Sequence, residues 1–255
     1  MFVEKRRQAV MALLNANRAV SVRELAEATQ ASDVTIRRDL AALAAEGRLS
    51  RRRGGAVVGD GAIHESTYGE KETVAPAEKR AIGAYAAHEL VEDGDALLIG
   101  AGSTTQAFVR ALRGKNLSIV TNSILVAHEL ASDSGIDVFV TGGSLRGSIY
   151  ALVGVQAERS LSTLNVPKLF ISGNGLTVER GLSTPNMLVA SIDRAMAAAA
   201  DNVYVLVDHT KVGIETMVQT VALSKIRAVV TDSLTSERHV DRLREAGVEV
   251  FVAPS

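Results

Sequence analysis

The N-terminal part of the chain places its apolar side chains at helical spacing in three short stretches. Residues 4–15 repeat apolar side chains at i, i+3 and i+4, which predicts a helix. Ser21-Val-Arg-Glu24 is a capping-box pattern and opens a second, short helix. After a brief turn, Ser32 can cap a third helix that ends near Gly47. Three short helices with a tight link between the last two predict a helix-turn-helix.

The third stretch carries two adjacent arginines away from its apolar stripe. On a wheel of about 100° per residue with Ile36 at 0°, Leu40 and Leu43 lie within about 40° of it and define the buried side. Arg38 lies at about 200°, almost opposite, so it should point into a DNA groove. Arg37 lies at about 100°, on one shoulder, and is better placed for a backbone phosphate.

Two further side chains share the outward side of this helix. Val34 and Thr35 lie at about 160° and about 260°, so they flank Arg38 and should come near base edges. Ser32, at the start of the helix, completes the expected contact set on the helix.

Asp39 lies at about 300°, too close to the buried stripe to face DNA. We expect it to pair internally with Arg6 or Arg7 on the first helix. A solvated charged face on an ordinary helix is the alternative explanation for the two adjacent arginines taken alone.

The segment that follows favours DNA binding over that alternative. Residues 48–57 predict two short strands around a basic tip, and a hairpin with a cationic tip beside a recognition helix is a winged helix. Such a tip can reach phosphates or a minor groove, where arginine is favoured. The tip residues expected at the DNA are Arg51, Arg52, Arg53 and Gly54.

Beyond residue 77, helical and β-rich stretches alternate, which is typical of an α/β domain with a mostly parallel sheet. The expected helices are 78–91, 103–113, 123–132, 155–164, 186–200 and 235–246. The expected strands are 96–99, 117–121, 137–141, 168–172, 202–207, 228–231 and 248–252. The Gly-, Glu- and Thr-rich stretch before them predicts a linker. The expected organisation is therefore a DNA-binding domain at 1–58, a linker at 59–77 and an α/β effector-binding domain at 78–255.

Polar turns follow several expected strands, at the edge where ligands bind in open α/β sheets. Gly100-Ala-Gly-Ser-Thr-Thr105 opens a helix, so its backbone N–H groups, helix dipole and hydroxyls favour an anion. Lys211 can neutralise a phosphate, which suggests a phosphorylated ligand. Ordinary tight turns between strands and helices are the alternative. The residues expected at the effector are Gly102, Ser103, Thr104, Thr105, Asn122, Ser123, Gly143, Arg146, Asn174, Asp208 and Lys211.

The balance of charged residues changes near residue 59, where the expected DNA-binding domain ends. Residues 1–59 hold 11 Lys and Arg against 6 Asp and Glu, whereas residues 60–255 hold 17 against 23. A basic module on an acidic body suggests a polyanion partner for the first part only.

The composition also bears on which chemical groups the protein can use and on where in the cell it is expected. The chain has no cysteine, which excludes disulfides and thiolate chemistry, and its five histidines lack ligand spacing, so we expect no metal and no cofactor. No apolar run is long enough to span a bilayer, and the charged cluster Glu4 to Arg7 argues against a signal peptide. We therefore expect a cytoplasmic protein.

Longer motifs resemble a known family. The run TIRRDLAALAAEGRLSRRRGGAV, preceded by VSVRELAEATQAS, closely resembles the N-terminal domain of DeoR-family transcriptional regulators. The segments VTNSILVAHELA, VTGGSLRGSIYALVG, GLSTP and VDHTKVG resemble successive parts of that family's C-terminal sensor domain. The resemblance implies sequence-specific DNA binding by a winged helix-turn-helix. It also implies a sensor related in fold to ribose-5-phosphate isomerase and glucosamine-6-phosphate deaminase, which binds phosphorylated sugars or related metabolites.

The resemblance also carries residues over, with three departures. It places the phosphate loop at 102–105 and a lysine-containing turn at 208–213. The family often has aspartates where this chain has Gly100 and Pro167, and a glutamate where it has Val189. The end of the site that reads ligand hydroxyls is therefore altered, and we expect an effector different from those of better-matched relatives.

These observations favour a ligand-responsive transcription factor over an enzyme. We expect a repressor of a carbohydrate-utilisation operon, released from double-stranded operator DNA by a phosphorylated effector and assembled as a homo-oligomer, a dimer or tetramer. The alternative is a sugar-phosphate isomerase or deaminase fused to a DNA-binding module, which needs a carboxylate base. Only Glu179 and Asp208 are available and they form no evident pair, so we expect no catalytic residue. A structural nucleoid protein is disfavoured by the polar ligand loops.

Overall fold

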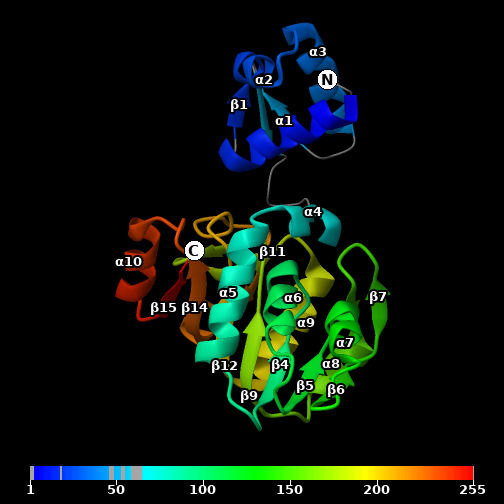
Figure 1. Ribbon diagram of the computed structural model, residues 1–255, viewed down its shortest axis with the longest axis vertical. Coiled ribbons are helices and arrows are strands. Elements are labelled where there is room, and N and C mark those ends of the chain that lie inside the picture. The colour runs from blue at the N-terminus through cyan, green and yellow to red at the C-terminus, as the bar shows by residue number, and fades with distance from the viewer. Residues whose placement is uncertain (1–2, 18, 46–48, 53–54, 59–64, 255) are drawn as a thin grey trace. The chain divides into compact units, whose positions relative to one another are not determined.

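The computed structural model describes residues 3–17, 19–45, 49–52, 55–58 and 65–254. The chain divides into two compact units, residues 1–64 and residues 65–255 (Figure 1). Each unit has its own hydrophobic core, so each is described by itself.

The first unit is a winged helix. Its helices are α1 (Val3–Asn17), α2 (Val22–Thr29) and α3 (Asp33–Ala45), and its strands are β1 (Ala19–Ser21), β2 (Leu49–Arg52) and β3 (Gly55–Val58). The three strands form an antiparallel sheet in the order β1-β3-β2. The predicted capping box is confirmed, because the Ser21 side chain accepts from the Glu24 backbone N–H and the Glu24 carboxylate accepts from the Ser21 N–H at 2.8 Å. Strand β1 is too short for its pattern to have predicted it.

The second unit is built on a seven-stranded sheet in which all pairs are parallel. The strand order is β15-β14-β12-β9-β4-β5-β6. Their bounds are β4 (Ala96–Ile99), β5 (Leu117–Thr121), β6 (Ile136–Val140), β9 (Val166–Ile171), β12 (Ala200–Leu206), β14 (Ile226–Asp232) and β15 (Glu249–Ala253). All seven expected strands are present with small shifts at their ends. The mostly apolar runs of the inner strands reflect burial on both faces.

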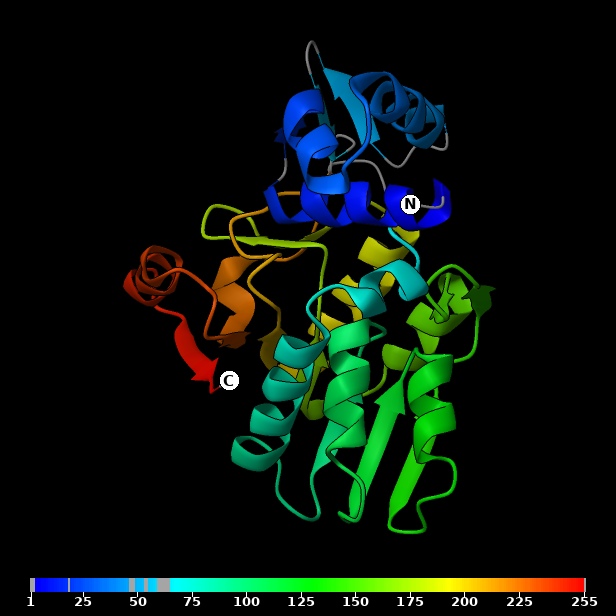
Figure 2. The ribbon, with the colours of Figure 1, turned by 45° about the horizontal axis from the view of Figure 1, so that its top comes forward.

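Helices cover both faces of this sheet (Figures 1 and 2). One face carries α5 (Pro76–Glu89), α6 (Ser103–Arg110) and α7 (Ile124–Leu130), and the other carries α8 (Val155–Leu161), α9 (Met187–Ala198) and α10 (Glu237–Glu245). Alternate side chains of one strand enter the two cores, as Leu97 packs under α5 and α6 while Leu98 packs under the opposite helices. A row of stacked rings, Phe108, Phe170 and Tyr204, joins α6 to the sheet with centroids 4.4 and 5.1 Å apart.

The strand order reverses between β4 and β9. From β4 the chain continues outward through β5 and β6, and from β9 it continues the other way through β12, β14 and β15. The connections that leave β4 and β9 therefore diverge and open a crevice at the carboxyl edge of the sheet, where ligands bind in such folds.

Several short elements lie outside the predicted alternation. They are the hairpin β7 (Ser144–Arg146) and β8 (Ala151–Val153), the small antiparallel sheet of β10 (Gly175–Thr177), β11 (Gly181–Thr184) and β13 (Val218–Val221), and a 3-10 turn at Leu223–Lys225. Strands of three or four residues have too little sequence to show a period.

The expected linker requires a correction. Residues 65–77 belong to the second unit, and within them Tyr68–Thr73 forms a helix, α4. The Thr67 side chain accepts from the Glu70 N–H, and the Glu70 carboxylate accepts from the Thr67 N–H at 2.9 Å. This second capping box stabilises a helix that the composition of the stretch concealed. Residues 59–64 lie outside the described part of the chain.

Close contact between α5 and α6 depends on Gly83. A Cβ atom at this position would lie 2.6 Å from the backbone nitrogen of Phe108. We therefore expect Gly83→Ala to lower the free energy of unfolding of the second unit by about 1–3 kcal/mol, because the two helices would have to separate. The matched control is Gly69→Ala in α4, where an added Cβ meets no atom within 4 Å. Urea unfolding checks both variants, and an equal loss in both would contradict the packing argument.

Candidate functional site

The recognition helix presents the polar face that its sequence predicts. Ile36 and Leu43 are fully buried, whereas Arg37 and Arg38 are exposed. The Val34 side chain is 65% exposed although it is apolar. Such exposure is typical of a residue at a binding surface.

Asp39 is fixed inside the unit, as predicted. Its carboxylate is buried, and it accepts hydrogen bonds from Arg6 Nε at 2.6 Å and from Arg7 Nε at 3.2 Å. This pairing ties α3 to α1 and neutralises an acid that would otherwise repel DNA phosphates.

The wing is described only in part. Arg51 and Arg52 lie in β2, whereas Arg53 and Gly54 at the tip lie outside the described residues. Gly55 begins β3, and a Cβ there would lie 2.5 Å from the backbone oxygen of Val20 in β1. Glycine at this position lets the central strand β3 approach β1 closely.

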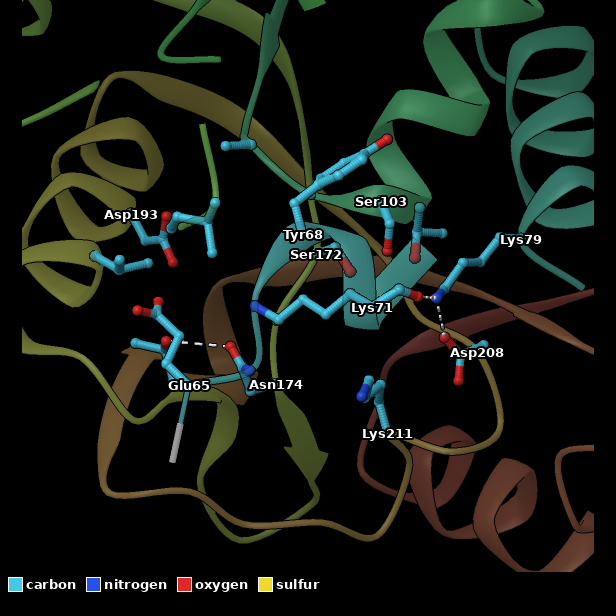
Figure 3. Close-up of a pocket in the computed structure, with 17 residues that line it drawn as sticks. Glu65, Tyr68, Lys71, Lys79, Ser103, Ser172, Asn174, Asp193, Asp208 and Lys211 are labelled. Carbon is cyan, nitrogen blue, oxygen red and sulfur yellow. Dashed lines mark hydrogen bonds and ion pairs between the residues drawn. The ribbon is translucent and has the colours of Figure 1, made fainter. Parts of the chain in front are cut away.

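The second unit holds a pocket at the crevice between β4 and β9 (Figure 3). Its walls come from α4, the start of α5, the loop after β4, the loop after β9, the loop after β12 and one face of α9. Six of the residues expected at the effector line it: Gly102, Ser103, Thr104, Asn174, Asp208 and Lys211.

One side of this pocket suits an anion. Helix α6 begins at Ser103, and a helix leaves its first backbone N–H groups without partners inside the helix. Lys79 and Lys211 stand on the same side as Ser103 (Figure 3). N–H donors, a helix dipole and ammonium groups are the features that favour a bound anion such as phosphate.

Lys79 is only 4% exposed and is surrounded by oxygen atoms. Its ammonium donates to the backbone oxygens of Lys71 at 2.5 Å and Val74 at 2.6 Å, and lies 3.7 Å from Asp208 Oδ2. Burial lowers the pKa of Lys79, although the neighbouring Asp208 carboxylate opposes this shift. Asp208 is itself buried and accepts a hydrogen bond from the Thr210 N–H at 3.0 Å.

The opposite side of the pocket carries carboxyl groups. Glu65 and Asp193 stand there, and the Lys71 side chain extends toward them (Figure 3). Burial raises the pKa of Asp193 to about 8, so this acid carries its proton at neutral pH. Burial lowers the pKa of Lys71 to about 8, with the nearby Glu65 carboxylate acting in the opposite sense.

Comparison with protein families decides what kind of chain this is. The DeoR-like helix-turn-helix domain matches residues 6–61, and the DeoR C terminal sensor domain matches residues 74–233. The chain belongs to the DeoR family of transcriptional regulators. The first unit is thus the DNA-binding part of this regulator and the second its sensor, as the sequence motifs predict.

Several transcriptional regulators are similar to this chain along nearly its whole length. The HTH-type transcriptional regulator GlpR of Haloferax volcanii is 35% identical over 98% of each chain. The HTH-type transcriptional repressor GlcR of Bacillus subtilis is 31% identical over 99% of this chain and 97% of its own. The lactose phosphotransferase system repressor of Staphylococcus epidermidis is 32% identical over 89% of this chain and 90% of its own. Among solved structures, ribose 5 phosphate isomerase A of Neisseria gonorrhoeae aligns with a TM-score of 0.40 and 19% identity, over 58% of this chain and 56% of that one.

Five of the residues predicted at the effector do not line the pocket of the regulator. The Thr105 hydroxyl is buried and donates to the Gly102 backbone oxygen at 3.0 Å. Ser123 caps α7 by accepting from the Val126 N–H at 3.3 Å. Gly143 has a φ of +104°, a turn conformation that favours glycine.

The other two of the five, Asn122 and Arg146, do not line the pocket but hydrogen-bond to residues that do. Asn122 accepts from the Ala101 N–H at 3.0 Å and donates to the Leu152 backbone oxygen at 3.3 Å, so it joins the loop after β4 to the hairpin β7–β8. Arg146, in that hairpin, donates through Nε to the Glu65 carboxylate at 2.7 Å.

The departures from the family pattern fall at different distances from the site. Val189 lines the pocket, one helical turn before Asp193 on α9, so an apolar side chain stands where the family often has glutamate. Gly100 and Pro167 do not line it, since Gly100 faces the Ile171 side chain and Pro167 lies within β9.

Three of the pocket residues that sequence reasoning missed come from the segment assigned to the linker. Glu65, Tyr68 and Lys71 line the pocket from this segment. The signal that could have located them is the Thr67-x-x-Glu70 capping box, which places Tyr68 and Lys71 on one face of a short helix. No sequence pattern marks Asp193 as a pocket residue, because a single acid in an amphipathic helix is expected to lie on the solvent-exposed face.

Across the described residues, no group of three or more His, Cys, Asp or Glu side chains is arranged to hold a metal ion. Over the same residues, every helix falls short of the length and apolar content that crossing a bilayer requires.

The pocket's two shifted groups predict a pH dependence for anion binding. As the pH rises from 7 to 9, Lys71 loses its positive charge and Asp193 gains a negative one, because both pKa values are about 8. A phosphate monoester, with a second pKa of about 6, keeps its charge across this window. We therefore expect its affinity to fall by roughly tenfold or more. Calorimetric titration of glycerol 3-phosphate at three pH values checks this. Lys71→Met should flatten the profile, and an affinity that rises with pH would contradict it.

Proposed function

We propose that this regulator is a repressor of a carbohydrate-utilisation operon, and that a phosphorylated sugar or related metabolite releases it from its operator. The observation that carries the proposal is the pocket at the switch point, in which the first turn of α6 and the ammonium groups of Lys79 and Lys211 stand together. The relatives named as repressors, GlcR and the lactose phosphotransferase system repressor, support the sign of regulation.

The proposal assigns DNA contacts to the first unit. Arg38 and the exposed Val34 are to meet base edges, while Arg37 and the wing arginines are to meet phosphates. The internal pairing of Asp39 with Arg6 and Arg7 supports this assignment, since it holds this acid away from the exposed face of α3.

Release requires that the effector bind one state of the sensor more tightly than another. If that state misplaces the two recognition helices of an oligomer, DNA and effector oppose each other reciprocally. We therefore propose a homo-oligomer, a dimer or tetramer held by the second unit, because operators of helix-turn-helix proteins mirror a two-fold axis of the protein. Because operator binding takes place on the chromosome, we also propose that the protein is cytoplasmic.

We infer that the pocket senses its ligand and does not turn it over. Isomerisation or deamination needs a free carboxylate base near a carbon-bound proton. Asp193 is protonated at neutral pH because its pKa is about 8, Glu65 is paired with Arg146, and Asp208 faces Lys79. A turnover assay with aldose and ketose phosphates separates the two functions, and product formation would favour the enzyme.

Arg38 is the first residue to test for operator recognition. We expect Arg38→Ala to lose about 1–3 kcal/mol of specific binding, because a bidentate contact to a base would be removed. Arg52→Ala should weaken binding evenly across sequences and lower the salt slope by about 1. Fluorescence anisotropy on an operator obtained by in vitro selection measures both, with the exposed Arg227→Ala of the second unit as control. Equal loss of specificity in the first two variants would refute the assignment.

Lys211 is the residue to test for the switch. Lys211→Ala should bind operator normally but require about 10–100-fold more effector for release, because a charged partner of the phosphate is lost. Ser103→Ala should show the same defect in milder form. The measurement is operator release against effector concentration, using a compound that releases the wild type. Lys225→Ala, on an exposed turn, is the matched control. Release of Lys211→Ala at the wild-type concentration would place the phosphate elsewhere.

A further inference from the structure

The carboxylate of Glu65 uses one oxygen and leaves the other unpaired. Its side chain is 7% exposed, and Oε2 accepts hydrogen bonds from Nε of Arg146, at 2.7 Å, and from Nη2 of the same residue. Oε1 is buried, and it has no hydrogen-bond partner among the residues that the structure describes. A buried carboxylate oxygen in this condition is costly, and native proteins rarely leave one without a partner from protein, water or ligand.

The unpaired oxygen belongs to the pocket wall. Glu65 lines the pocket on the side opposite Lys79 and Lys211, so a ligand whose phosphate lies at α6 would extend toward it (Figure 3). Oε1 is an acceptor and therefore needs a donor, which leaves a hydroxyl or an ammonium group as the ligand end.

The surrounding charges favour the hydroxyl. The Arg146 guanidinium already pairs with Glu65, and the Lys71 ammonium extends toward the same carboxyl groups, so a further cation would meet two like charges. A carboxylate-bearing end is disfavoured for the opposite reason, because it would bring a second negative charge beside the Glu65 carboxylate, whose side chain is only 7% exposed. An uncharged polyol end avoids both of these repulsive interactions.

We propose that Glu65 is a specificity-determining residue, which accepts a hydrogen bond on Oε1 from a hydroxyl group at the end of the ligand remote from its phosphate. Arg146 is its positioning residue, since the guanidinium holds Oε2 and so directs Oε1. This inference rests on the proposed function, because it assumes that the phosphate binds at α6 and Lys211. It also gives Arg146, which does not line the pocket, a defined part in recognition.

The test compares ligands that fill one or both sides of the pocket. Full-length protein is titrated by calorimetry at pH 7 with inorganic phosphate, glycerol 3-phosphate, ribitol 5-phosphate, ribose 5-phosphate, glucitol 6-phosphate and glucose 6-phosphate. We expect at least one polyol or sugar phosphate to bind the wild type about tenfold or more tightly than phosphate does, because a charged acceptor strengthens the added hydrogen bond. A wild type that binds none of them better than phosphate overturns the inference.

The variants assign that gain to Glu65. Glu65→Gln should keep the wild-type affinity for inorganic phosphate and lose most of the gain for the preferred compound. Arg146→Met should do the same, whereas Arg146→Lys should restore part of the gain, which a merely structural role would not produce. Glu179→Gln, at an exposed glutamate paired with Arg242, is the matched control. An undiminished gain in Glu65→Gln refutes this inference alone, whereas phosphate affinity unchanged by Lys211→Ala refutes the proposed phosphate site.

Discussion

The pocket depends on one buried side chain, Lys79. From the first turn of α5 its ammonium reaches two backbone oxygens at the end of α4, those of Lys71 and Val74, and stands beside Asp208 at the end of β12. Burying an ammonium is costly unless oxygen atoms replace its water, and here three of them do. The same contacts fix α4 over the carboxyl edge of the sheet, which brings Lys71 to the ligand crevice.

This arrangement divides the pocket into two chemical halves. The half at α6 offers N–H groups and ammonium groups, and the half at α9 offers Glu65 and the protonated Asp193. In the proposed binding mode a phosphate cannot exchange places with a hydroxyl-bearing end without meeting Glu65, so the two halves would orient the ligand as well as bind it. The segment that supplies Glu65 is also the part of the sensor nearest in sequence to the DNA-binding unit.

Periodic features of the fold could be predicted from the sequence, and features that depend on distant partners could not. The recognition helix and the pairing of Asp39 with Arg6 and Arg7 follow from helical angles, and the seven parallel strands follow from their apolar runs. Short hairpins lack a period, and α4 lay in a stretch of linker-like composition. The distinction between Lys211, which lines the pocket, and Arg146, which pairs with Glu65, required the tertiary structure because both are basic residues in polar turns.

The most direct test of the account is whether the phosphate group itself is what the sensor recognises. Thermal unfolding of the full-length protein is measured with pairs of compounds, each sugar or polyol phosphate beside its unphosphorylated parent. A ligand raises the Tm by mass action when it binds the folded state, so the account predicts that Tm rises with phosphorylated members and stays unchanged with their parents. Equal stabilisation by the parents, or no stabilisation by any phosphorylated compound across pentoses, hexoses and their polyols, would contradict it.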